Sequence, residues 1–224
     1  MKKVFSAKIP ADVSHHVALS SALLAWGLLL TVASQSVAQE QMEGCIVVIC
    51  RILEKAELNL RIAAGETVAL VFELAREMEY DLQTGPLNNL YAMLRDLANE
   101  SGRHKGKREK KQQKSSFRDI LKSVEDGTAP EETIRFGKEY VTMTSWTWMC
   151  RYNAFKEALG SGTNTHLAHN MLLRDIFGLG IPVAKEMKET RSNKDERMYN
   201  NALSSKTRKQ TRNQRRDNKA AYND

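Results

Sequence analysis

Two short segments concentrate the basic side chains of this 224-residue chain. The first runs from Arg103 to Lys114 with one acid, Glu109, and the second from Ser204 to Lys219 with one acid, Asp217. Each segment carries +6 and the whole chain +7, so the rest has a net charge of −5. The basic residues of the two segments are Arg103, Lys105, Lys107, Arg108, Lys110, Lys111, Lys114, Lys206, Arg208, Lys209, Arg212, Arg215, Arg216 and Lys219.

Segregated positive charge of this kind is typical of proteins that bind polyanions. Each Lys or Arg that neutralises a phosphate releases condensed counterions, and Arg also forms bidentate contacts to phosphate. We therefore expect these residues to bind RNA or DNA without sequence preference. The alternatives are that the segments only solubilise the chain or that they carry a nuclear import signal.

Other residue types give weaker indications of chemistry. His166 and His169 are three apart on an expected helix, a spacing that suits a metal, but no third ligand lies near them in the sequence. No nucleophile elbow, HExxH or Cys-x-x-Cys motif occurs. We therefore expect no enzyme, no catalytic or metal-binding residue and no cofactor. The three cysteines are expected to be free thiols in a reducing compartment.

The densest aromatic stretch runs from Ser145 to Lys156. Trp148, Tyr152 and Phe155 recur at helical spacing, so they form either one core face or a platform that stacks on bases. Trp146 points elsewhere on the same helix and is expected to cover a groove or to meet another subunit.

The composition predicts an all-α fold, a bundle of several helices in two parts joined by a basic loop, with a disordered basic C-terminal tail. Helices are expected over residues 13–38, 41–63, 66–82 and 87–98, with Gly65 breaking the second from the third. A short helix follows over 117–124, and a longer one begins near Pro130 and continues through the aromatic stretch to Leu159. The next helix runs from Thr163 to Gly178 or Gly180.

These elements divide the chain into four regions. Residues 1–101 are the N-terminal helical region, which has a strongly apolar first helix, and residues 102–116 are a basic linker or loop. Residues 117–190 are the C-terminal helical region, and residues 191–224 are the flexible basic tail.

The first apolar run, Val13 to Gln39, contains no Lys, Arg, Asp or Glu. It has three interpretations: a core helix, a secretory signal with Ser36–Ala38 as its cleavage site, or a retained membrane helix. Whether residues 1–38 are cleaved, inserted in a membrane or packed in a core is left open by the sequence.

Within this run, Ser14 to Ser34 (SHHVALSSALLAWGLLLTVAS) is similar to the start of a spike helix in hepadnavirus core (capsid) proteins. A His-His pair is followed at matching spacing by Ala-Leu, Trp-Gly and Thr-x-Ala. The segment Gly65 to Val68 resembles a later part of the same family, and the basic tail matches its RNA-packaging tail in kind. The resemblance implies a capsid protein.

Together these features favour a viral nucleocapsid or coat-type structural protein that self-assembles and packages RNA or DNA through its basic segments. Such a protein is a homo-oligomer and is found in the virion or in the host cytoplasm or nucleus. The alternative is an exported or membrane-anchored helical protein with an N-terminal signal or anchor helix, and only this alternative involves a membrane.

Overall fold

The structure is a computed structural model that describes residues 13–42, 44–82, 87–99, 106–182, 198, 201–202 and 204–206. The described residues are mostly helical, as predicted, with one two-stranded sheet as the exception. Residues up to Ile181 form one compact unit, and the chain from Pro182 onward is a second unit. The tail expected over 191–224 lies almost entirely outside the described residues.

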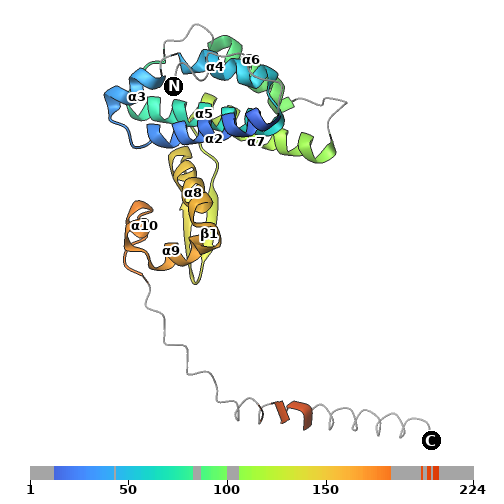
Figure 1. Ribbon diagram of the computed structural model, residues 1–224, viewed down its shortest axis with the longest axis vertical. Coiled ribbons are helices and arrows are strands. Elements are labelled where there is room, and N and C mark those ends of the chain that lie inside the picture. The colour runs from blue at the N-terminus through green and yellow to red at the C-terminus, as the bar shows by residue number, and fades with distance from the viewer. Residues whose placement is uncertain are drawn as a thin grey trace, which may run out of the picture. The chain divides into compact units, whose positions relative to one another are not determined.

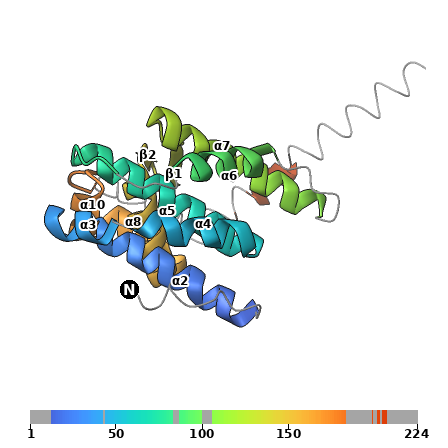
Figure 2. The same ribbon diagram turned by 90° about the horizontal axis from the view of Figure 1, so that it is seen from above.

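The first six described helices pack together around one of their number, α5 (Leu58–Glu77), some directly and some through another helix (Figure 1). The other five are α2 (Val13–Leu30), α3 (Gln35–Met42), α4 (Cys45–Lys55), α6 (Leu87–Asn99) and α7 (Lys107–Asp126). Helix α5 lies between α2 and α7, as Figure 2 shows, and it also packs against α4. It is buried on nearly all sides because apolar or small residues occupy most of its positions, among them Leu60, Val68, Val71 and Leu74.

Helix α2 is a core helix of this unit. Leu23, Trp26 and Leu30 are buried against α5 and its neighbours. The helix ends earlier than predicted, because residues 31–34 form a turn before α3 begins. Among the described helices, none is long and apolar enough to cross a membrane.

Gly65 does not break a helix, which corrects the sequence prediction. It lies inside α5, where that helix comes close to α7. A Cβ atom at this position would lie 2.7 Å from Ile120 Cδ1 and 3.0 Å from Phe117 Cε1. Glycine here permits a close helix contact, and the chain keeps its helical path despite the low helix propensity of glycine.

We expect the substitution Gly65→Val to lower the free energy of unfolding by about 1–3 kcal/mol, as overpacking in a closed core does. Phe117 and Ile120 are fully buried and have little room to move. Urea unfolding of the full chain measures the change. In an Ile120→Val background, which lacks the Cδ1 atom, the cost of Gly65→Val should shrink; simple additivity of the two costs would contradict the close contact.

A β-hairpin replaces the helix expected to begin near Pro130. Strands β1 (Glu132–Phe136) and β2 (Glu139–Met143) pair antiparallel, with Ile134 opposite Val141. The β-branched residues of this stretch favour strands, and Gly137, at φ +60°, supplies the tight turn between them. Pro130 and Glu131 resemble a helix start, because Pro suits the first turn and Glu the positive end of a helix, but they lead into β1, of which Glu132 is the first residue.

Helix α8 (Trp146–Leu159) follows the hairpin and has a well-defined start. Ser145 is its N-cap and accepts a hydrogen bond from the Trp148 backbone N–H at 3.2 Å. The Glu73 carboxylate of α5 accepts from the backbone N–H groups of Trp146 and Thr147 at 2.7 and 2.8 Å. This carboxylate lies at the positive end of the α8 dipole and attaches α8 to α5.

The helix predicted after residue 162 is divided in two. A 3₁₀ turn (η1, Gly160–Gly162) leads into α9 (Thr163–His169), and α10 (Met171–Ile176) follows. Asn170 separates them, because its side-chain oxygen accepts hydrogen bonds from the Leu172 and Leu173 backbone N–H groups and so caps α10.

The aromatic stripe of α8 is a core face. Trp148, Tyr152 and Phe155 each contact the ring of Phe177 edge-on, with centroids 6.1–6.3 Å apart. This confirms the core interpretation over the base-stacking one. Trp146 is buried as well, and its indole N–H donates to Ser123 Oγ of α7 at 2.8 Å.

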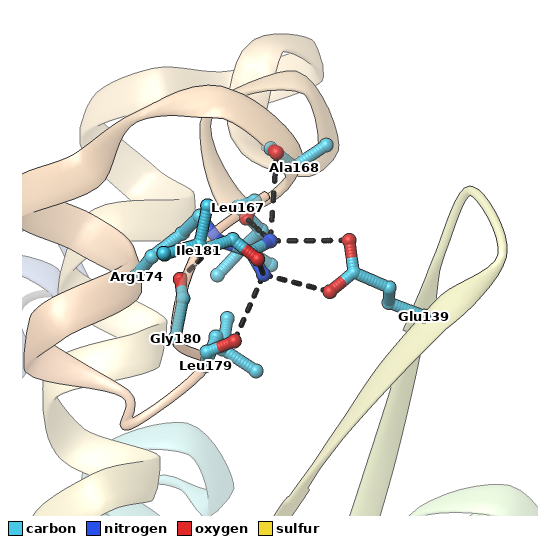
Figure 3. Close-up of polar contacts among 7 residues, drawn as sticks. All are labelled: Glu139, Leu167, Ala168, Arg174, Leu179, Gly180 and Ile181. Atoms are coloured by element: carbon cyan, nitrogen blue, oxygen red, sulfur yellow. Dashed lines mark hydrogen bonds and ion pairs between the residues drawn. The ribbon is translucent and has the colours of Figure 1, made fainter. Parts of the chain in front are cut away.

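Arg174 joins the segment after α10 to the hairpin, as Figure 3 shows. Its side chain is fully buried and forms a bidentate ion pair with Glu139 of β2, at 2.7 and 3.2 Å. It also donates hydrogen bonds to five backbone carbonyls, those of Leu167, Ala168, Leu179, Gly180 and Ile181. Every guanidinium nitrogen therefore has a partner, which compensates for the burial of the charge.

Candidate nucleic-acid interface

The first basic segment forms the beginning of helix α7 and is not a loop from residue 107 onward. Gln113, Phe117, Ile120 and Val124 are buried on one face of α7, against α5 and α6. Their spacing of four, three and four residues continues the apolar face upstream into the basic segment. The expected linker or loop over 102–116 is therefore corrected from residue 107 onward, and residues 102–105 lie outside the described part of the chain. Lys, Arg, Gln and Glu are good helix formers, and Gln113 anchors the first turns of α7.

Gln113 shows how a polar side chain supports that buried face. Its amide nitrogen donates to the Leu97 backbone carbonyl of α6 at 3.4 Å. Its amide oxygen accepts from Arg61 Nη1 of α5, also at 3.4 Å. The basic half of α7 is therefore attached to two other helices and presents its outer surface in a fixed orientation.

Opposite the buried face, basic residues form a continuous stripe, which we call the α7 stripe. Its members are separated by four, three, four and four residues and so share one side of the helix. They are Lys107, Lys111, Lys114, Arg118 and Lys122. All are exposed except Lys114, which is half-buried, and none forms an ion pair with any described residue. At 1.5 Å per residue the stripe is about 22 Å long.

The charge around the stripe is strongly positive. Between Lys107 and Arg118 the helix carries six Lys or Arg residues and one acid, Glu109, for a net charge of +5. Arg108 is exposed on the flank of the stripe, and Lys110 is half-buried. No side chain caps the N-terminal end of α7, so the positive end of the helix dipole adds to this potential. Such a surface attracts phosphate groups.

The sequence-predicted residues are therefore brought together only in part. Lys107, Arg108, Lys110, Lys111 and Lys114 lie within the first turns of one helix. Lys206 is exposed in the second unit. The other predicted residues lie outside the described part of the chain: Arg103, Lys105, Arg208, Lys209, Arg212, Arg215, Arg216 and Lys219. Sequence reasoning missed Arg118 and Lys122, although the i, i+4 spacing from Lys114 would have found them.

The opposite end of α7 is held by a different set of contacts. The Arg76 guanidinium of α5 donates hydrogen bonds to the backbone carbonyls of Ser123 and Val124. Gly127, at φ +76°, ends the helix in the left-handed conformation, and its N–H bonds the Ser123 carbonyl. Both helix ends are therefore positioned by the layer beneath them.

The two histidines lie at the end of helix α9, and His166 contacts the residue that follows that helix. His166 Nδ1 lies 3.3 Å from the Asn170 amide nitrogen, and both histidines are in the last turn of α9. In the described ranges, no group of three or more His, Cys, Asp or Glu side chains is placed to hold a metal ion. The Cys45, Cys50 and Cys150 thiols are free, and burial raises the pKa of each, to about 12 for Cys45 and about 11 for Cys150.

Comparison with known proteins identifies the family. Residues 1–125 match the family model for interferon-related developmental regulators, and residues 170–220 match the model for the interferon-related protein conserved region. Interferon-related developmental regulator 1 of Rattus norvegicus is 40% identical over 215 residues, which is 95% of this chain and 48% of the relative. The Sus scrofa protein of the same name is 41% identical over 203 residues, 89% of this chain and 45% of the relative.

A second member of the family is equally similar. Interferon-related developmental regulator 2 of Mus musculus is 40% identical over 216 residues, 95% of this chain and 48% of the relative. The chain belongs to the interferon-related developmental regulator family. It spans about half the length of the curated relatives it matches.

The family assignment overturns the viral interpretation. The resemblance of Ser14 to Ser34 to hepadnavirus core proteins was misleading, because an Ala- and Leu-rich helix matches many unrelated helices. A nucleocapsid or coat-type protein of a virion, which packages a genome, was therefore the wrong class. The alternative took the N-terminal apolar run as a signal or anchor helix, and this assignment was also wrong, because α2 packs as a core helix. The expected homo-oligomer stays a prediction.

Proposed function

We propose that this protein binds RNA or DNA without sequence preference, through phosphate contacts of the α7 stripe and of the basic tail. The observation that supports this most strongly is the α7 stripe itself. Its five cations share one exposed side of a helix, and none is neutralised by an acid among the described residues. The proposed function is binding and includes no catalytic step.

The geometry suits a charged backbone better than individual base edges. The stripe is a single row of long, flexible side chains about 22 Å long, with Ser115, Gln112 and Asp119 beside it and no exposed aromatic ring on the helix. Contacts of this type position a nucleic acid but do not read its sequence. The rigid helix adds a fixed direction along which a phosphate backbone is held.

Fluorescence anisotropy with labelled probes of 20 nucleotides or base pairs tests the proposal on the full chain. Single-stranded RNA, single-stranded DNA and both duplexes are compared at 50 and 200 mM salt. We expect binding of probes of unrelated sequence within a few-fold of one another, and an affinity loss of at least about a hundredfold between the two salt concentrations. Affinity that does not change with salt, or that depends on one sequence, would contradict phosphate-directed binding.

A further inference from the structure

A groove opens between α2, α5, α7 and α8, with a volume of about 910 Å³. Thr67 and Leu70 of α5 and Met149 of α8 line it, together with Trp146. On one side the lining comes from α2, where Ser21, Leu24, Ala25 and Leu28 are all uncharged. Leu24 is 42% exposed, so α2 presents an apolar face to solvent that no other described element covers.

The remaining lining residues give this apolar groove a negative charge. The acids come from α5, α7, α8, the start of β1 and the residue before β1, and they are Glu66, Asp119, Glu131, Glu132 and Glu157. Among the described residues that line the groove, none is Lys or Arg. Because acids of a folded protein are usually interspersed with bases, five acids around one apolar groove favour a positively charged occupant.

Glu66 is the most unusual of these acids. Its side chain is half-buried on α5, yet it forms no hydrogen bond or ion pair with any described residue. Burial raises the pKa of its carboxyl group above the ordinary value. A cation in the groove would supply a partner that the Glu66 carboxylate does not have among the described residues.

We propose that this groove binds an amphipathic helix of a partner protein that carries Lys or Arg along the edge of its apolar face. The apolar residues of that helix pack on α2 and on the groove floor, and its cations meet Glu66 and the other acids. An extended peptide is a poorer fit, because the groove is lined mainly by helices, whose backbone groups are already paired.

This site is separate from the α7 stripe. Helix α7 contributes Ser116 and Asp119 to the groove. Ser116 is nearly opposite Lys107 and Lys114 on the helix, and Asp119 lies between Ser116 and the edge of the stripe. The two surfaces therefore attract occupants of opposite charge. The proposal for one surface can be contradicted by experiment without affecting the proposal for the other.

A displayed library of 16-residue peptides tests the proposal on the full chain. Each peptide has Leu at positions i, i+3, i+4 and i+7 and an equal choice of Lys, Glu and Gln at the flanking positions. We expect selection to enrich Lys over Glu at these flanking positions, and a selected peptide to bind in an anisotropy assay. Selection of no peptide, or of peptides without enriched Lys, would overturn the proposal.

Matched variants then test whether the selected peptide binds in the groove. The double substitution Glu131→Lys with Glu157→Lys should weaken it about tenfold or more, because it replaces attraction by repulsion in the groove. The control, Glu40→Lys with Glu54→Lys, makes the same change of charge at exposed acids outside the groove and should alter the affinity less than twofold. Equal losses in the two variants would overturn the assignment of the site.

A steric variant excludes an effect of charge alone. Ala25→Trp places a large side chain on the exposed side of α2 within the groove, where no core contact is disturbed, and should also reduce peptide binding about tenfold. Circular dichroism checks that each variant keeps the helical content of the parent. If the chain forms a dimer that Ala25→Trp dissociates, a second copy occupies the groove and the proposal is wrong.

Discussion

Replacing Arg174 with Ala is expected to lower the free energy of unfolding by about 3–5 kcal/mol, the cost of breaking a buried ion pair from one side. The substitution removes the guanidinium that pairs with Glu139 and that donates hydrogen bonds to five backbone carbonyls in the segments around α10. Buried carbonyls that lose their donor are costly in a protein interior. The loss should appear as a fall of roughly 10 °C in the midpoint of thermal unfolding of the full chain.

A second ion pair of the same residue types serves as the control. Arg95 pairs with Glu125 at 2.6 Å, but its side chain is 62% exposed, so water screens the pair. We expect Arg95→Ala to change the stability by less than about 1 kcal/mol. Arg174→Lys should be destabilising as well, because a single ammonium group cannot contact the carboxylate and the carbonyls on both sides. Similar stabilities for Arg174→Ala and Arg95→Ala would show that the Arg174 contacts contribute little.

Neutralising the centre of the α7 stripe is expected to cause a large loss of nucleic-acid affinity. The triple substitution of Lys111, Lys114 and Arg118 by Gln removes three cations and keeps good helix formers at each position. Each lost phosphate contact removes part of the counterion release, so affinity for a 20-nucleotide probe at 50 mM salt should fall about 10- to 100-fold. The buried face of α7 is untouched, so the unfolding midpoint should stay the same.

A matched triple variant separates the position of the charges from their number. Arg51, Lys55 and Arg135 are exposed, lie on other elements, and when changed to Gln alter the net charge by the same amount. Long-range attraction alone predicts equal losses for the two triple variants. Direct contact of the α7 stripe with phosphates predicts a loss of less than about threefold for the control.

Local sequence patterns predicted the elements whose boundaries and buried faces depend on residues close together in the sequence. Helix α6 is found at Leu87–Asn99, against a predicted range of 87–98, because its apolar spacing lies between clear boundaries. The aromatic stripe of α8 was likewise predicted to be a core face as one alternative, and the ring of Phe177 completes it. Gly160, at φ +53°, ends the regular part of α8 where the sequence predicted its end.

The errors come from features that depend on distant residues. Gly65 was read as a helix break because its partners, Phe117 and Ile120, are more than fifty positions away. The hairpin was missed because Pro130 and the acids after it resemble a helix start, although apolar residues alternate within each strand: Ile134 with Phe136, and Val141 with Met143. Nothing local marks Arg174 as buried, since its carboxylate partner is 35 positions away.

For the first basic segment, Arg103 to Lys114, one property was predicted and another was missed. Its charge was evident from composition, and five of its seven predicted residues lie on one described helix. Its helical form was missed, because the anchors Phe117 and Ile120 follow the charges and Gln113 among them is polar. The helical form determines which residues belong to the α7 stripe, since only a helix places Arg118 and Lys122 in line with Lys107.

The dependence of nucleic-acid affinity on salt tests the central claim most directly. The slope of log K against log salt concentration reports how many phosphates the protein neutralises, at about 0.7–0.9 per contact. With single-stranded RNA, we expect the slope of the α7 triple variant to be smaller than that of the parent chain by about two to three. The triple variant of Arg51, Lys55 and Arg135 should keep the parent slope. Parallel slopes for the parent chain and the α7 triple variant would contradict phosphate binding by this helix.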